Sequence, residues 1–542
     1  MNFGFSMRKK VFMLSILALG VTLLFSQSLL AEDLGRDDYE FASPTDPTGL
    51  ILTWQNDPSE TMSMTWRTEE EPRALEKNES YIYYTSEEDP SSDDFKFQEA
   101  RTWTFEETDY WVHGGELRNL EPDTEYTFYV ASGDETSDEY KFRTAPAESR
   151  EIDFIAGGDS RTNVPERRYI TKRAAEQDPE FILFTGDMQQ SPPNYDSNWI
   201  RWFKDWEEKA VTDEGRMIPM IPAIGNHEVV GGYDGDWEGA QYYYNSFLLP
   251  GNEKFFALEY GPDLTIVSLD TNHSTPVLGA QVDWLEKTLP DLQEDWVVAQ
   301  YHVPAWPSRR GFFHDTVQPI RDHWVPLFEE YNVELVHEAH DHTYKVTPSL
   351  GGVSEFREEL DQWIEAGKER AVEDFDPEED YTAWSFPELS SLSGGNYEDV
   401  EGVDSIVEGM EELPYLMSLN LIQEEGDIEE ELGGLDYWMV YEEFSDSGLY
   451  EDFWEEEFKD RYNALDSENS VKYIGDGGWG APLRDPDDPE EKWYLDQAEQ
   501  KYNFFELTLK PEDDRIEITP YLFPEEDWEG EMEELDSFYL ER

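Results

Sequence analysis

The sequence predicts a multidomain protein with an all-β sandwich on its N-terminal side, followed by an α/β domain. Its 542 residues exceed what one hydrophobic core usually supports, so two or three domains are expected. Segments that alternate apolar and polar residues, such as 61–66 and 126–130, are typical of half-buried strands. From residue 151 onward, apolar runs alternate with longer helix-like stretches, which indicates α/β layering.

The first residues have the pattern of an export signal. Basic residues at 8–10 precede an apolar run at 11–25, and small residues then lead to an acidic start near residue 31. The run is short for a membrane span, and an uncleaved anchor stays open as an alternative. We therefore predict a signal peptide at 1–31 and an exported protein, either periplasmic or extracellular.

The region at 46–147 carries the short alternating strands, which are separated by turn segments. Regular short strands over about 100 residues are typical of a β-sandwich. The stretch 117–146, with the corner LEPDTEY at 120–126, resembles the end of a fibronectin type III-like domain. We find no catalytic motif in this region.

Apolar runs buried on both faces are expected to form the strands of the α/β domain. They lie at 152–156, 181–185, 217–224, 264–269, 296–300 and 333–336, and strand patterns resume at 471–478, 503–509 and 516–521. The block between these two sets is acidic, rich in aromatic residues and patterned for helices. We predict an α/β domain at 150–348 and 470–522, an acidic, mostly helical insertion or cap at 349–469, and an acidic tail at 525–542.

Five polar clusters follow successive apolar runs of the α/β region. They contain Asp159, Asp187, Asn226-His227-Glu228, His302, and His340 with His342. The carboxyl ends of strands in an open α/β sheet face one edge, where loops converge on ligands. Carboxylate, amide oxygen and neutral imidazole are all ligands for hard or borderline metal ions. Each cluster alone fits an ordinary turn or a buried histidine, but their joint occurrence in this order favours a metal site.

These ordered motifs (GD, GD, GNHE, HVP and AHDH) resemble those of the calcineurin-like metallophosphoesterase superfamily. The preceding sandwich makes the chain most similar to purple-acid-phosphatase-type enzymes. The resemblance implies a four-layer α/β-β/α domain with two divalent or trivalent ions, drawn from Fe, Mn and Zn. It implies the following ligand set: Asp187 bridging the ions, Asp159 and His342 on the first, and Asn226, His302 and His340 on the second.

The resemblance also implies three catalytic roles. His227 would donate a proton to the leaving oxygen, Glu228 would orient His227, and Arg161 would face the phosphate. Two positions depart from the family pattern, because Gln190 stands where purple acid phosphatases have a tyrosine ligand and Arg161 stands where related enzymes have a histidine. The first metal site therefore needs Gln190, Gln189 or water, or binds its ion weakly, and no charge-transfer colour is expected.

Charge is the most unusual property of the composition. Lys and Arg number 40 against 125 Asp and Glu, which gives a net charge of −85 and argues against nucleic-acid or anionic-membrane partners. We interpret the acidity as halophilic adaptation, with a cation-binding surface as the alternative. The absence of cysteine excludes disulfides and thiolate chemistry.

The predicted function is that of a secreted phosphoesterase, most simply a phosphomonoesterase, in which a metal-bound hydroxide attacks a small phosphorylated substrate. Two alternatives remain. One is a phosphodiesterase or nucleotidase on the same scaffold, and the other is a non-catalytic, acidic binding protein with a degenerate metal site. The sequence does not indicate the physiological substrate or the oligomeric state.

Overall fold

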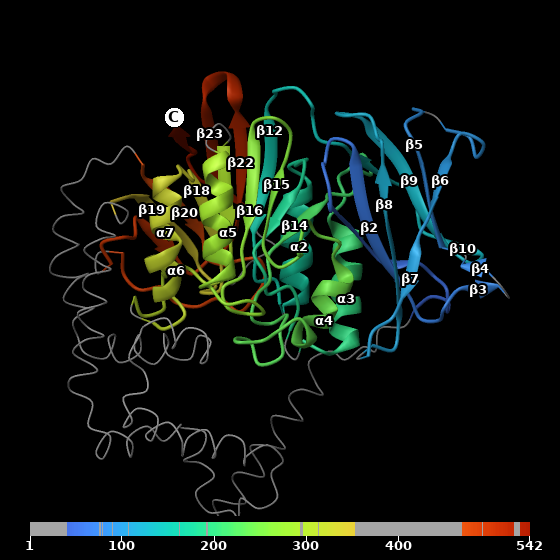
Figure 1. Cartoon of the computed structure of the whole chain (residues 1–542), viewed down its shortest axis with the longest axis horizontal. Coiled ribbons are helices and arrows are strands. Elements are labelled where there is room, and N and C mark those ends of the chain that lie inside the picture. The colour runs from blue at the N-terminus through green and yellow to red at the C-terminus, as the bar shows by residue number, and fades with distance from the viewer. Residues whose placement is uncertain are drawn as a thin grey trace, which may run out of the picture.

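The computed structural model describes residues 41–352 and 469–542, apart from short gaps at 75–76, 79, 89, 107, 162, 191–192, 293–295, 313, 490–491 and 525–531. The predicted signal peptide at 1–31 and nearly all of the predicted insertion at 349–469 lie outside these residues. The described chain runs from a β domain at one end of the molecule to two larger sheets with helices (Figure 1).

The N-terminal domain consists of two antiparallel sheets that face each other. One has the order β1 (Thr48–Thr53), β2 (Thr61–Thr68), β8 (Trp111–Arg118) and β7 (Arg101–Trp103). The other has the order β10 (Glu135–Thr136), β9 (Glu125–Ser132), β5 (Ser80–Thr85) and β6 (Lys96–Glu99), with β11 (Tyr140–Arg143) also on β9. Met62, Met64 and Trp66 of β2 are fully buried, and the residues between them are buried as well, so both faces of β2 are covered. A short pair, β3 (Arg73–Ala74) and β4 (Lys77–Asn78), stands apart.

The first sheet of the α/β domain combines strands from both ends of that domain. Its order is β14 (Met220–Pro222), β13 (Ile182–Phe184), β12 (Ile152–Gly157), β22 (Tyr502–Lys510), β23 (Arg515–Phe523) and β24 (Glu533–Glu534), with β25 (Phe538–Glu541) also on β23. β12, β13 and β14 are parallel, whereas β22 is antiparallel to β12. The C-terminal hairpin therefore lies directly beside the first strand of the domain (Figure 1).

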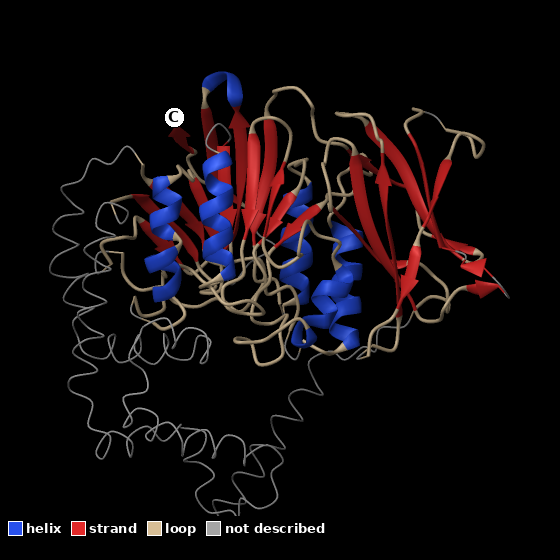
Figure 2. Ribbon diagram, viewed as in Figure 1, coloured by secondary structure: helices blue, strands red, loops and turns tan. Residues whose placement is uncertain are grey.

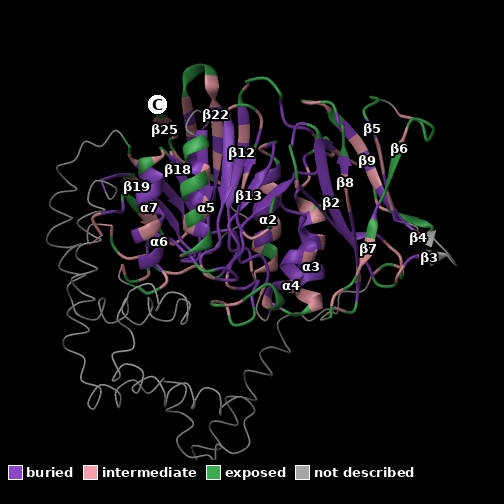
Figure 3. Cartoon of the chain, in the orientation of Figure 1, coloured by how far each residue is buried: buried purple, intermediate pink, exposed green. Residues whose placement is uncertain are grey.

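The second sheet holds the remaining strands. Its order is β15 (Phe256–Glu259), β16 (Leu264–Ser268), β17 (Trp296–Gln300), β18 (Leu335–Glu338), β20 (Val471–Gly475), β19 (Tyr344–Leu350) and β21 (Gln497–Glu499). β16, β17, β18 and β20 are parallel, and their residues are almost all buried, as Figure 3 shows. Parallel strands covered on both faces account for the continuous apolar runs in the sequence.

The two sheets pack face to face and helices cover their outer faces. Phe505 of β22 stacks on Tyr344 of β19 with ring centroids 5.6 Å apart, which joins the sheets. Helices on the first sheet are α2 (Val164–Ala175), α3 (Asp196–Lys209) and α4 (Gln241–Ser246), and on the second sheet α5 (Ala280–Thr288), α6 (Gln318–His323) and α7 (Val325–Glu330). Trp206 of α3 lies edge-on to Phe184 of β13, and Phe328 of α7 stacks on Tyr301 beside β17. The α/β domain thus has the four layers expected.

The predicted fold class, an all-β domain followed by an α/β domain, is confirmed. Each of the apolar runs predicted as strands contains a strand of one of the two sheets. The segment predicted as an acidic tail contributes β24 and β25, which pair with β23 and extend the first sheet. No helix in the described part of the chain combines the length and apolar character that crossing a bilayer requires.

The β domain is docked on the α/β domain through β1 and α3. The Arg67 guanidinium lies 3.5 Å from the ring centre of Phe203 and donates to the carbonyls of Gly49 and Ser246. Glu207 of α3 accepts a 2.7 Å hydrogen bond from the amide of Gly49. A buried guanidinium and a buried carboxylate therefore both lie at this interface, each bonded to backbone groups.

The loops that follow the parallel strands gather at one edge of the two sheets. Figure 2 shows this concentration of loops, in tan, below the strands. The loops after β12, β13, β14, β17 and β18 each begin with one of the predicted polar clusters. The fold therefore brings all five clusters to a common edge, as the topology of an open α/β sheet requires.

Candidate metal centre

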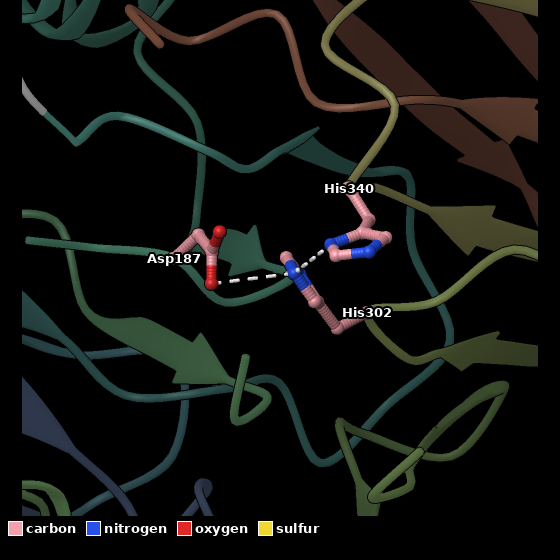
Figure 4. A group of neighbouring side chains, drawn as sticks. All are labelled: Asp187, His302 and His340. Atoms are coloured by element: carbon pink, nitrogen blue, oxygen red, sulfur yellow. Dashed lines mark hydrogen bonds and ion pairs between the residues drawn. The ribbon is translucent and has the colours of Figure 1, made fainter. Parts of the chain in front are cut away.

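The predicted ligands form two groups of buried side chains that share Asp187. One group is Asp187, His302 and His340, and the other is Asp159, Asp187 and His342; within each group the candidate ligand atoms lie within 4.8 Å of one another. In Figure 4, His302 lies between Asp187 and His340, which approach it from opposite sides. A carboxylate common to two groups is the arrangement that a bridging ligand requires.

His302 connects the first group to Asn226. Its Nε2 atom lies 3.3 Å from Asp187 Oδ1, 3.1 Å from Asn226 Oδ1 and 2.9 Å from His340 Nδ1. Its other ring nitrogen, Nδ1, lies 2.7 Å from the carbonyl oxygen of Thr185. Because a carbonyl only accepts, Nδ1 carries the hydrogen and donates it, which leaves the Nε2 lone pair directed at the group.

His342 is held in the same way on the second group. Its Nδ1 donates to the carbonyl of Pro482 at 2.9 Å, so its Nε2 carries the free lone pair. That Nε2 lies 3.1 Å from Asp159 Oδ1 and accepts a 3.1 Å hydrogen bond from Arg161 Nη1. The other oxygen of Asp159 accepts from the backbone amide of His340 at 2.8 Å, which fixes the carboxylate.

This donor set fits metal ions. In each group a histidine lone pair faces a carboxylate oxygen, and two acceptors at such distances repel unless a cation lies between them. Asp159 Oδ1 and Asp187 Oδ2 are buried without a hydrogen-bond donor. Buried anionic oxygens without donors are costly, and coordination of a metal ion is one of the few ways to satisfy them. Carboxylate, imidazole and amide ligands suit Zn, Mn or Fe.

The electrostatic environment of the two ligand groups also favours a positive charge at the ligand atoms. Burial lowers the pKa of His302, but the carboxylates of Asp187 and Asp159 outweigh it and raise the pKa to about 9. Burial alone would raise the pKa of Asp187, yet His302 and His227 hold it well below its ordinary value. The carboxylates thus stabilise a cation beside them.

The ligands lie on sharply turned backbone. Asp159, Asp187, His340 and His342 all have positive φ, at 59°, 52°, 79° and 60° respectively. This region is uncommon for residues with a side chain, and such residues often mark functional sites. Gly477, in the loop after β20, packs so closely that a Cβ atom there would lie 2.0 Å from Asp159 Oδ2. The conformation of these loops therefore fixes the positions of the ligands.

Of the three residues predicted to be catalytic, His227 and Arg161 lie at the ligand groups. His227 Nε2 is 3.8 Å from Asp187 Oδ2, and its side chain is 10% exposed, whereas that of Asp187 is 1% exposed. Arg161 contacts His342 as described above. Glu228 is buried and accepts from the backbone amides of Asp187, Met188 and Gly225 at 2.8 to 2.9 Å. It therefore joins the loops that carry the ligands and His227, and its role in orienting His227 stays a prediction.

The position of the family tyrosine is occupied by a glutamine pair. The side chain of Gln189 is buried and donates to the carbonyl of His227 at 2.7 Å, while its Oε1 atom has no hydrogen-bond donor. The backbone carbonyl of Gln190 accepts from Asn198. Whether Gln189, Gln190 or water completes the first metal site stays a prediction.

Four residues at the centre were not singled out from the sequence: Tyr233, Arg310, Gly477 and Arg484. The Tyr233 hydroxyl lies 3.0 Å from His340 Nε2, and Arg484 donates to the His340 carbonyl at 3.3 Å. Tyr233 and Arg310 lie in loops that follow motif strands, whereas Gly477 and Arg484 follow β20, which carries no motif, and none of the four belongs to a recognisable spacing. Their contribution depends on how distant loops meet in space.

Two family models match the chain. Residues 47–144 match the model described as the purple acid phosphatase N-terminal domain, and residues 161–344 match the calcineurin-like phosphoesterase model. The chain is therefore similar to the calcineurin-like phosphoesterases over residues 161–344. This match contains four of the five motifs, and the first motif, Gly158-Asp159, lies just before it.

Curated relatives match part of this chain. An uncharacterised protein of Mycobacterium tuberculosis is 28% identical over 251 residues, which covers 39% of this chain and 45% of the relative. Purple acid phosphatase 1 of Ipomoea batatas is 24% identical over 186 residues, covering 32% of this chain and 38% of the relative. The chain spans less than half the length of these relatives.

Solved structures share the fold of this chain. A purple acid phosphatase from yellow lupin (Lupinus luteus) seeds has a TM-score of 0.56 at 16% identity, covering 93% of this chain and 76% of that one. A structure of PhoD has a TM-score of 0.57 at 12% identity and covers 93% of this chain and 91% of that one. At such identities the likeness concerns the fold.

Proposed function

We propose that this phosphoesterase hydrolyses phosphate esters, with phosphomonoesters as the main class, at a centre of two metal ions. The observation that carries the proposal is the sharing of Asp187 by two groups of buried ligand atoms. Asp159 and His342 would complete one ion's ligands, and Asn226, His302 and His340 the other's. The printed names of the Ipomoea relative and the lupin structure support the phosphatase class.

The ions would supply the electrophilic chemistry, because bound metal polarises a phosphoryl oxygen and produces a nucleophile from water at neutral pH. The chain's own residues orient the substrate. Arg161 lies against His342, where its guanidinium can bind two oxygens of a phosphate. His227 lies beside Asp187, is the more exposed of the two and is placed to give a proton to the departing alcohol. Glu228 would hold the loop that carries His227 in a fixed position relative to the loop that carries Asp187.

The test is metal-dependent turnover in the Asp187→Asn variant. Because Asp187 belongs to both groups, we expect the variant to lose both metal ions, measured by elemental analysis, and to lose phosphatase activity by at least about 1000-fold. Asp213→Asn is the matched control, since that side chain is 77% exposed on the surface. Full hydrolysis by Asp187→Asn, or by wild-type protein stripped with a chelator, would contradict the proposal.

A comparison of substrates on the metal-loaded protein separates the classes. Phosphomonoester, diester and nucleotide substrates are assayed side by side, and the highest kcat/KM is expected for a monoester. A preference for diesters or nucleotides would replace the phosphomonoesterase assignment by the phosphodiesterase or nucleotidase alternative. Metal-free wild-type protein with no turnover would instead favour a binding protein.

We also propose that the protein is exported and adapted to salt. The support is the signal-like pattern of residues 1–31 and the net charge of −85. Fractionation of cells that express the full chain, with N-terminal sequencing of the mature protein, tests the export. A mature protein that still begins at Met1 inside the cell would contradict it.

A further inference from the structure

Three arginines contact three consecutive residues of the loop after β18, one arginine for each residue. Arg484 Nη1 donates to the carbonyl of His340 at 3.3 Å, and Arg161 Nη1 donates to His342 Nε2 at 3.1 Å. Between them, Arg310 Nε lies 4.0 Å from Asp341 Oδ1. The three arginines come from different loops, after β12, β17 and β20, so the fold gathers them at the metal centre.

The positive charges of these arginines are close enough to act on one another. The pKa of Arg484 is lowered by burial and by the charges of Arg310 and Arg161, against the opposite effect of Asp159. Part of their hydrogen-bonding capacity is unused, because Arg310 Nη1 and Arg161 Nε are buried without an acceptor. Guanidinium groups without acceptors, held near one another, are prepared to bind an anion.

Two carboxylates lie near these arginines. Asp341 Oδ2 accepts from the backbone amides of Arg309 and Arg310 at 2.8 and 3.2 Å, while its Oδ1 lies 4.0 Å from Arg310 Nε, beyond hydrogen-bond distance. Burial and the charges of Arg310 and Arg161 lower the pKa of Arg484 overall, although Asp159 and Asp341 both act to raise it. Arg216, by contrast, has an oxygen of Asp178 at 2.5 Å.

A single phosphate group would not use all three arginines. Arg161, beside the metal ligand His342, is the one placed to share the scissile phosphate with the ions. Arg310 and Arg484 contact the residues before His342, namely Asp341 and His340, and Arg310 Nη1 is buried without an acceptor. Two guanidinium groups bind a phosphate or carboxylate with charge-assisted hydrogen bonds.

We propose that Arg310 and Arg484 form an anion subsite beside the metal centre, and that the substrate is a phosphate ester with a second phosphate or a carboxylate close to the scissile group. This inference rests on the proposed function, whose substrate class it narrows. It assigns a specificity role to two residues from loops outside the metal-ligand motifs.

The experiment compares substrates that share one carbon skeleton and differ in the second anion. Glycerol 2-phosphate has none, 2-phosphoglycerate adds a carboxylate and 2,3-bisphosphoglycerate adds a phosphate as well. For metal-loaded wild-type protein we expect kcat/KM to be at least about 10-fold higher for the doubly anionic substrates, mainly through KM. A comparison of 2-phosphoglycerate with 2,3-bisphosphoglycerate shows whether the subsite prefers a carboxylate or a phosphate.

The variants Arg310→Gln and Arg484→Gln should each reduce this preference by about 10-fold, and the double variant should abolish it. Arg310→Lys should keep part of it, because the charge remains while the planar fork is lost. Arg309→Gln is the matched control, since Arg309 is exposed and donates to the carbonyl of Asp485. Circular dichroism verifies that each variant is folded.

A binding measurement decides the question without turnover. Calorimetry compares methylphosphonate with methylene bisphosphonate, neither of which is an ester, and the metal content is measured afterwards. Tighter binding of the bisphosphonate by wild-type protein, lost in the double variant, supports the subsite even if no ester is hydrolysed and the proposed function fails. Equal preference in wild-type and double-variant protein, in either assay, would overturn the inference.

Discussion

Asp159 and Gly477 form the tightest approach of backbone and side chain at the metal centre. The φ of Gly477 is +85°, and a Cβ atom at this position would lie 2.0 Å from Asp159 Oδ2. The carboxylate cannot move away freely, because the same oxygen accepts from the amide of His340. Only glycine therefore leaves room for the Asp159 carboxylate at this position, and glycine also suits the positive φ.

We expect Gly477→Ala to weaken metal binding at the group that contains Asp159 and His342. The added methyl group must displace the Asp159 carboxylate, and small errors in ligand support typically cost about 10- to 100-fold in metal affinity. Titration with Zn or Mn, followed by elemental analysis, should show about one metal ion fewer per chain.

Gly311→Ala provides the control for this variant. Gly311 is exposed, and a Cβ atom there would meet nothing within 4 Å. Metal binding should therefore remain at the wild-type level in Gly311→Ala. Undiminished metal content in Gly477→Ala as well would show that the contact with Asp159 is unimportant for the ion.

The individual ligands were predictable, whereas the residues around them were not. The motifs identify Asp187 and His302, because each of these residues comes shortly after an apolar run that forms a strand. Tyr233 and Arg484 reach the same centre from long loops, and their positions depend on turns such as that at Asp476, where φ is 99°. Local sequence does not specify which loop tips meet, because that depends on packing between segments far apart in the chain.

At the scale of elements, the second sheet is held together by a buried lysine. Lys345 of β19 is fully buried and lies 2.6 Å from Glu338 Oε2 of β18 and 3.5 Å from Asp476 Oδ1, just after β20. Burial lowers the pKa of Lys345, but Asp476 and Glu338 outweigh this effect and raise it. Three neighbouring strands therefore share one ammonium group, directly behind the loop that carries His340 and His342.

Replacing this lysine by methionine should destabilise the α/β domain. Lys345→Met leaves two carboxylates buried without their counter-charge, and loss of one partner of a buried pair costs about 3–5 kcal/mol. Differential scanning calorimetry should record a lower unfolding midpoint. In the control Lys510→Met, which breaks a partly exposed pair with Glu517, the loss should stay below about 1 kcal/mol. Equal shifts in both variants would contradict this account.

Most strands of the two sheets were visible in the sequence because burial on both faces leaves a continuous apolar run. The exceptions lie at or near sheet edges. β21 has exposed residues, β24 consists of two exposed glutamates and β25 is only half-buried, so β24 and β25 resemble solvated segments until β23 is present beside them. Edge strands obtain their structure from a partner strand, and their own sequence carries little signal for it.

At the scale of the whole molecule, the interface between the two domains contains an ionisable group away from the metal centre. Glu207 of α3 is buried against β1, and burial raises its pKa from 4.5 to about 7, in spite of hydrogen bonds from the amides of Gly49 and Leu50. Because the folded pKa lies above the unfolded value, the folded state binds the proton more tightly. The associated stability is complete below about pH 4.5 and is lost as the pH rises through about 7.

We therefore expect Glu207→Gln to gain stability relative to wild type as the pH increases. The difference should grow by up to about 3 kcal/mol between the two pKa values, since one pKa unit corresponds to about 1.4 kcal/mol. Thermal unfolding of both proteins at pH 5 and at pH 8, in the same salt, measures it. Glu208→Gln is the control, because that neighbouring side chain is 41% exposed. A difference between Glu207→Gln and wild type that stays constant with pH would refute the assignment.

The position of β22 between β12 and β23 has a consequence for how the protein is made. Residues 152–156 of β12 pair with residues 505–509, so the ribosome completes one strand long before its partner exists. During that interval the N-terminal β domain can fold, while the first α/β sheet keeps an open edge. Assembly of that sheet must wait until residues 505–509 have been translated, and until then the unpaired chain is accessible to chaperones.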